Sequence, residues 1–119
     1  MESEIYQASD HGRAKHAGRP AATCVGCHQN PHEITPVQDP SSPVNRRNIA
    51  PLCASCHDDS KKMAPYDLRE QHPFASYALT VHGKAFAEGD FTAATCTDCH
   101  GSHDLHRPNN PLSKMHWAR

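Results

Sequence analysis

Every cysteine of this chain belongs to one five-residue pattern that occurs three times. The pattern C-x-x-C-H runs from Cys24 to His28, from Cys53 to His57 and from Cys96 to His100. It is the attachment signature of c-type haem, in which two thiols bind the porphyrin edge and the adjacent histidine becomes the proximal iron ligand. The sequence therefore predicts three covalent haems with proximal His28, His57 and His100, attached through Cys24, Cys27, Cys53, Cys56, Cys96 and Cys99.

Other uses of paired cysteines explain this pattern less well. A structural zinc site would take two C-x-x-C pairs, so three pairs leave one over, and zinc gives no reason for a histidine after each pair. A thioredoxin-like site needs one pair beside a βαβ pattern, which is not visible here. A disulfide framework would place its cysteines far apart in sequence.

The composition requires that something other than side chains fill the interior. Leu, Ile, Val and Phe together number 15 of 119 residues, too few for a conventional hydrophobic core. Haems would supply the missing apolar surface. We therefore expect a mostly irregular fold with a few short α-helices and little or no β-structure, wrapped around a stack of haems. The net charge of −1 argues against a nucleic-acid partner, and no run of 18 apolar residues could span a membrane.

The chain contains an imperfect internal repeat. Tyr6, His11 and Gly12 recur 71 positions later as Tyr77, His82 and Gly83, and His32 recurs as His103. Each repeat reads Tyr-x4-His-Gly, then C-x-x-C-H, then a further histidine. We expect one domain over residues 1–119, made of a first repeat (about 1–60) and a partial second repeat (about 72–119).

Two segments have recognisable local structure. Apolar residues recur at helical spacing after Pro73, which predicts one amphipathic helix from Pro73 to near Gly89, with His82 in its apolar stripe. The segment from Gln29 to Pro51 holds five of the ten prolines and is expected to be an extended wrapping loop.

Eight histidines remain after the proximal ligands are assigned. The repeat retains four of them in step with the haem motifs, which makes them the candidate distal ligands: His11, His32, His82 and His103. The repeat does not support a role for His16, His72, His106 or His116. None of the three methionines is placed by the repeat, so bis-histidine ligation is favoured over His/Met.

The spacing also suggests which haem each distal histidine serves. If the helical turn of the first motif continues, His28 and His32 project the same way, so His32 cannot cross the ring that His28 binds. We expect His32 to serve the second haem, His11 the first and His82 the third. His72 is an alternative for the second haem.

The sequence resembles the multihaem cytochromes c of anaerobically respiring bacteria and archaea, which are built from dihaem repeats. The resemblance is best carried by Thr80–Gly83 and Cys96–His103, and it covers nearly the whole chain. It implies electron transfer through closely packed haems, in the periplasm or outside the cell, with redox partner proteins or neighbouring cytochrome subunits. In some members of the family the subunits assemble into filaments, so a homo-oligomer or filament is a further expectation.

The leading hypothesis is an electron carrier and not an enzyme, because iron with two axial histidines has no open position for substrate. The alternative is an electron-input module or fragment of a catalytic multihaem reductase acting on nitrite, hydroxylamine or a sulfur compound. That activity would need a five-coordinate haem, whereas all three motifs are regular.

The segment Pro111–Trp117 raises a last expectation. Aligned with Pro43–Ile49, it would place a fourth motif at position 121, beyond Arg119. His103 would then be a distal ligand that serves a haem of a longer chain or of an adjoining one. The alternative is that His103 is a surface residue of a decayed repeat.

Overall fold

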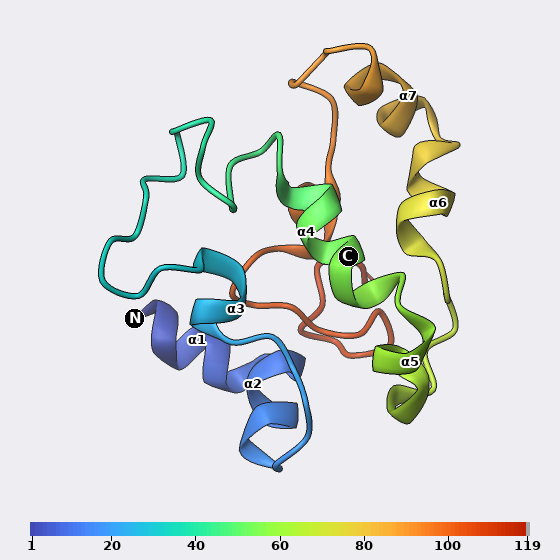
Figure 1. Ribbon diagram of the computed structural model, residues 1–119. Coiled ribbons are helices and arrows are strands. Elements are labelled where there is room, and N and C mark those ends of the chain that lie inside the picture. Colours follow the sequence, from blue (N-terminus) through green and yellow to red (C-terminus); the bar gives the residue numbers. More distant parts are fainter. Residues whose placement is uncertain (119) are drawn as a thin grey trace. The chain divides into compact units, whose positions relative to one another are not determined.

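The computed structural model of the chain describes residues 1–118. Its α-helices are four to nine residues long, and this part of the chain contains no β-strand (Figure 1). The predicted fold class is confirmed in its helix content and lack of sheet. The helices are α1 (Glu2–Ala8), α2 (Asp10–His16), α3 (Cys24–His28), α4 (Ile49–His57), α5 (Ser60–Met63), the 3-10 turn η1 (Ala64–Tyr66), α6 (Pro73–Ala78), α7 (Val81–Ala87) and α8 (Cys96–His100).

The chain forms two compact units that interleave in sequence. The first unit comprises Met1–Ile34 together with the chain from Thr97 onward, and the second comprises Thr35–Cys96. Within residues 1–118, no helix is both long enough and apolar enough to cross a lipid bilayer.

The expected single helix from Pro73 to Gly89 is wrong, because the chain breaks between α6 and α7. Thr80 is extended, with φ −75° and ψ 163°, and its Oγ accepts a hydrogen bond from the Gly83 N–H at 3.1 Å. This is an N-cap, so a new helix begins after Thr80. Gly89, with φ 98°, lies just beyond α7, as expected for a glycine that ends a helix.

The first repeat has the same break. Ser9 separates α1 from α2 and accepts a hydrogen bond from the Gly12 N–H at 3.1 Å. Gly12 and Gly83 are buried where the two helices of each pair meet, and a Cβ on either would collide with a backbone carbonyl, that of Tyr6 or Tyr77 respectively. The glycine of each His-Gly pair therefore has a packing role.

The tyrosine of each repeat fixes the start of the following motif. The Tyr6 hydroxyl donates to the carbonyl of Ala22 at 2.7 Å, and the Tyr77 hydroxyl donates to that of Ala94 at 2.8 Å. These two carbonyls lie two residues before Cys24 and Cys96. The tyrosine hydroxyl thus connects the helix pair of each repeat to its haem motif.

A chain of turns after each motif is also repeated, and it corrects the alignment of Pro111. The N–H groups of Asp39, Ser42 and Asn45 each donate to the carbonyl three residues earlier in the chain. The N–H groups of Asn110, Ser113 and His116 do the same. The offset is 71 throughout, so Pro111 corresponds to Pro40 and not to Pro43. The sequence alignment was wrong by one three-residue turn.

The polypeptide alone has very little hydrophobic core. Among the residues described, Ile49 and Ala50 are the only apolar side chains classed as buried, whereas Ser9, Ser42, Asn45, Thr95 and Ser113 are buried polar residues. Ile49 also begins α4, so the predicted wrapping loop ends at Asn48 and Pro51 lies in the first turn of a helix, where proline is tolerated. Side-chain and backbone hydrogen bonds therefore organise the interior where apolar packing is scarce.

Candidate haem sites

Each C-x-x-C-H motif forms a helical turn with its histidine as the last helical residue. The motifs occupy all of α3 and α8 and the end of α4. At α3 the turn is started by Thr23, whose Oγ accepts the Gly26 N–H at 3.1 Å. Residues three positions apart lie on one face of a helix, so the two cysteines of each motif point to the same side. A single flat porphyrin edge can therefore meet both thiols.

The helices do not continue past the motif histidines. After α3, Gln29 has φ 64°, and after α8, Gly101 has φ 84°. The expectation that His28 and His32 share one helical face rested on a continuing turn, and that premise is wrong. A positive φ at these two positions turns the chain out of the helical path at once, which frees His32 and His103 from the direction of the motif helix.

Tyr6 adjoins the first motif electrostatically as well as by hydrogen bonding. Burial raises the pKa of Tyr6, and the charge that the Cys24 and Cys27 thiols carry when ionised raises it further. Cys24 is exposed and Cys27 is half-buried, which leaves this pair accessible for attachment of a cofactor. The same exposed and half-buried combination occurs at Cys99 and Cys96.

Two histidines that are 75 positions apart in sequence face one another in the first compact unit. The ring centroids of His28 and His103 are 6.2 Å apart, with an angle of 17° between the ring planes. Nδ1 of His28 is buried and has no hydrogen-bond partner among residues 1–118. The structure thus brings a proximal candidate of the first motif together with a distal candidate of the second repeat.

Asp10 holds the segment that follows His103. The Asp10 N–H donates to the carbonyl of Leu105 at 2.9 Å, and the Arg107 N–H donates to Asp10 Oδ2 at 2.7 Å. The side chain of His106, between them, is only 6% exposed, and its Nδ1 lies 3.9 Å from Asp10 Oδ1. This segment is therefore fixed to the first turn of α2.

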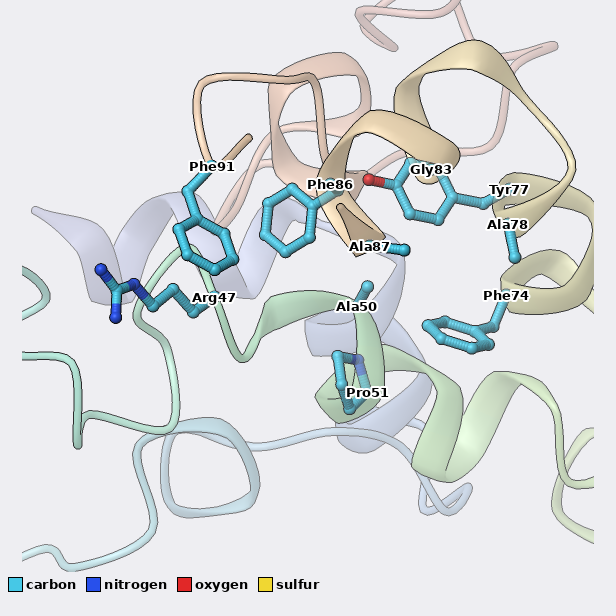
Figure 2. A pocket seen from close by; sticks show the side chains of 10 residues that line it. All are labelled: Arg47, Ala50, Pro51, Phe74, Tyr77, Ala78, Gly83, Phe86, Ala87 and Phe91. Carbon is cyan, nitrogen blue, oxygen red and sulfur yellow. The ribbon is translucent and has the colours of Figure 1, made fainter. Parts of the chain in front are cut away.

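An apolar pocket of about 280 Å³ lies in the second compact unit, beside the helix that carries the second motif. Figure 2 shows the rings of Phe74, Phe86 and Phe91 around Ala50 and Pro51 of α4. Phe86 and Phe91 pack edge to face at 5.1 Å, and the Arg47 guanidinium lies 4.4 Å from the Phe91 ring centre. The pocket offers aromatic surface with a positive charge at one end.

The predicted apolar stripe of residues 73–89 is only partly buried in this pocket. Phe74, Tyr77, Ala78 and Phe86 line it, as the spacing suggested. Val81 is 76% exposed and His82 is also exposed, because the break at Thr80 ends the continuous helical face and only the later part of α7 lines the pocket.

These features fit covalent haem. The motif helices present paired thiols and a terminal imidazole, and the chain lacks an apolar core of its own while several large apolar side chains remain exposed. A flat apolar cofactor bound along the motif helices would cover such side chains, and the imidazole at the end of each motif helix would bind its iron.

The sequence model of one protein family, described as cytochrome c7 and related cytochrome c, matches residues 9–101. The match begins at the Ser9 cap, includes all three motifs, and ends just after His100. The chain belongs to this family. It is therefore a multihaem electron-transfer cytochrome with covalently bound haem c. Searches of curated proteins and of solved structures gave no significant match.

The other ligand candidates of the cytochrome are dispersed over its elements. His11 lies on α2 and His57 at the end of α4, both half-buried. His32, His82 and His100 are exposed, and the His32 N–H donates to Asn30 Oδ1 at 3.0 Å. In the described part of the cytochrome, no three His, Cys, Asp or Glu side chains cluster so as to hold a bare metal ion.

Sequence reasoning missed His106 and Asp10 because neither is retained by the repeat. The repeat gives His106 no role, whereas its side chain is nearly buried against Asp10. The residue at the equivalent position of the first repeat is Thr35, whose side chain cannot form an ion pair with a carboxylate. A contact between residues 96 positions apart has no local signature that could have revealed it.

Proposed function

We propose that this cytochrome transfers electrons through three covalently attached haems, one for each motif. The observation that supports the number three is that every motif is complete and forms the same helical turn, ending at His28, His57 and His100. Membership of the cytochrome c7 family supports the chemistry. The proposal includes a single haem-binding domain over residues 1–119, built from the two repeats.

The attachment residues and the ligand candidates have distinct proposed roles. Cys24, Cys27, Cys53, Cys56, Cys96 and Cys99 would form the thioether bonds, and the three motif histidines would be the proximal ligands. The candidate distal ligands are His11, His32, His82 and His103, of which three would serve the three haems of this chain. When bound, haem iron accepts and releases one electron at a time. Aromatic side chains such as Phe86 and Phe91, which line the pocket beside α4, would exclude water from a haem bound there and so reduce solvent rearrangement during transfer.

The proposed cellular location follows from membership of the cytochrome c7 family. We propose a carrier without catalytic activity, located in the periplasm or outside the cell, where it serves anaerobic respiration or extracellular electron transfer. Its partners would be redox proteins or neighbouring cytochrome subunits, including copies of itself in an oligomer or filament. The exposed motif cysteines Cys24 and Cys99 support edge-on approach of a partner, because a ring attached there lies near the surface.

The number of haems is tested by intact mass under denaturing conditions. The expected mass is that of the polypeptide plus three haem units. The double substitution Cys53→Ser and Cys56→Ser should remove exactly one unit, whereas Ser55→Ala, inside the same motif, should remove none. A mass equal to the bare chain with zinc ions would overturn the proposal.

The absence of catalysis is tested by exposing the reduced protein to carbon monoxide and the oxidised protein to cyanide. If all three irons carry two histidines, neither ligand binds readily and the optical spectra stay low-spin. Rapid binding at one haem of the unmodified protein would instead favour the reductase alternative.

A further inference from the structure

We propose that His28 and His103 are the two axial ligands of one iron, that of the haem attached at Cys24 and Cys27. This pairing rests on the proposed function, since it requires a haem at the first motif. It differs from the sequence expectation in two ways. That expectation gave the first haem to His11, and it left His103 for a haem of a longer or adjoining chain.

The ring geometry carries the proposal. Imidazole nitrogens bind metals at about 2.0–2.1 Å, as at zinc, and the ring centre lies about 1.1 Å behind the nitrogen, so two imidazoles on opposite sides of one metal have centroids about 6.3 Å apart. The observed separation of His28 and His103 is 6.2 Å, and the ring planes are within 17° of parallel. The two rings thus have the spacing of a trans pair.

A direct aromatic contact would also fall in the range of about 4.5–7 Å between centroids, so the distance needs a second observation. The motif supplies it, because its signature makes His28 the proximal ligand of the haem at Cys24 and Cys27, and the repeat retains His103 as a distal candidate. A proximal and a distal candidate therefore face one another at the spacing of a trans pair. A haem iron between the two rings explains this arrangement.

The backbone holds His103 from both sides. Before it, Gly101 has φ 84° and its N–H donates to the Thr97 carbonyl at 3.0 Å. After it, Leu105 and Arg107 are hydrogen-bonded to Asp10. His32, its counterpart in the first repeat, is exposed. His103 is therefore positioned for ligation in a way that the repeat alone does not predict.

The experiment uses the holoprotein and replaces His103 by methionine, which keeps the iron six-coordinate but raises its reduction potential. His103→Met should give one haem of three the spectrum of His/Met ligation and shift one step of a redox titration upward. The exposed and unassigned His16 provides the matched control, and His16→Ala should change neither measurement. If His103→Met alters no haem, the pairing is overturned.

A second measurement identifies the haem concerned. When Cys24→Ser and Cys27→Ser remove the first haem, adding His103→Met should leave the two remaining haems unchanged. A shift that persists in this background would overturn the pairing, because His103 would then serve another haem.

If the double-serine protein does not fold, the variant His11→Met of the complete holoprotein is measured instead. If His103 is the ligand, His11→Met must not alter the same redox step as His103→Met. Failure of the proposed function is distinguishable, since it appears as a mass with fewer than three haems before any substitution.

Discussion

The carboxylate of Asp10 accepts a hydrogen bond from the backbone N–H of Arg107, 97 residues further along the chain, at 2.7 Å. Asp10 also donates its own N–H to Leu105, so a single residue in the first turn of α2 fixes the segment that carries His103. The same carboxylate lies 3.9 Å from Nδ1 of the nearly buried His106. Asp10 is therefore a positioning residue for the proposed ligand His103.

Replacing Asp10 by alanine should lower the free energy of unfolding by about 1–2 kcal/mol, because it removes a charge-assisted hydrogen bond from a carboxylate that is only partly exposed. It should also produce a fraction of high-spin haem, which added imidazole restores to low spin. Asp10→Asn keeps an acceptor oxygen for the Arg107 N–H and should have a smaller effect on both. The measurements are denaturant titration and optical spectra of the holoprotein. Equal effects of the two substitutions would show that the hydrogen bond is not what positions the segment.

Gly83→Ala should destabilise the cytochrome by about 1–3 kcal/mol, since overpacking at a close approach forces the backbone to move. A Cβ at Gly83 would collide with the Tyr77 carbonyl, and the helix pair α6 and α7 would have to separate. Gly26→Ala is the matched control within a helix, because its Cβ would meet only Thr23 Oγ1 at 3.5 Å, an ordinary contact. Thermal unfolding of the two variants checks this, and the prediction fails if Gly26→Ala is the more harmful change.

The sequence predicts the chemistry and the helix content of this chain better than it predicts contacts between distant segments. The expectation of a few short helices without sheet is confirmed within residues 1–118. The break at Thr80 was missed because the apolar spacing of Phe74, Tyr77, Ala78 and Phe86 continues across it, although a threonine three residues before a glycine is also a capping signal. At Thr80 the apolar spacing predicts a continuous helix whereas the capping threonine predicts a break, and the structure has the break.

The juxtaposition of His28 and His103 was not predictable, for a physical reason. It depends on the reversal at Gly101, with φ 84°, and on the distant contact of Asp10 with Arg107. Neither leaves a periodic signal. The internal repeat selected four candidate histidines, but it treated His32 and His103 as equivalent, whereas His32 is exposed and His103 is half-buried.

Arg46 should be hard to replace, because it joins two segments of the second compact unit. Its Nε donates to the Phe91 carbonyl at 2.6 Å and its Nη2 to the Ala93 carbonyl at 2.7 Å. A lysine cannot make this pair of bonds from one planar group. Arg46→Lys should therefore cost nearly as much as Arg46→Ala, about 1–3 kcal/mol of unfolding free energy. Arg69→Lys, at an exposed position, is the control and should cost little, as measured by denaturant titration.

His82→Ala should convert one haem of three from low-spin to high-spin and open it to carbon monoxide. The reason is that the repeat keeps His82 and His11 in step with the motifs, and Thr80 fixes the start of α7 two residues before His82. An exposed imidazole that is not a ligand can be removed without changing the spectrum. His72→Ala is therefore the control, and it also tests the alternative ligand of the second haem.

Combining His82→Ala with Cys96→Ser and Cys99→Ser tests the expected assignment to the third haem, because the high-spin signal should then disappear. If the signal persists, His82 serves the second haem, whose motif helix α4 lies with α7 in the second compact unit. If His82→Ala changes no spectrum while His72→Ala does, the repeat has selected the wrong histidine.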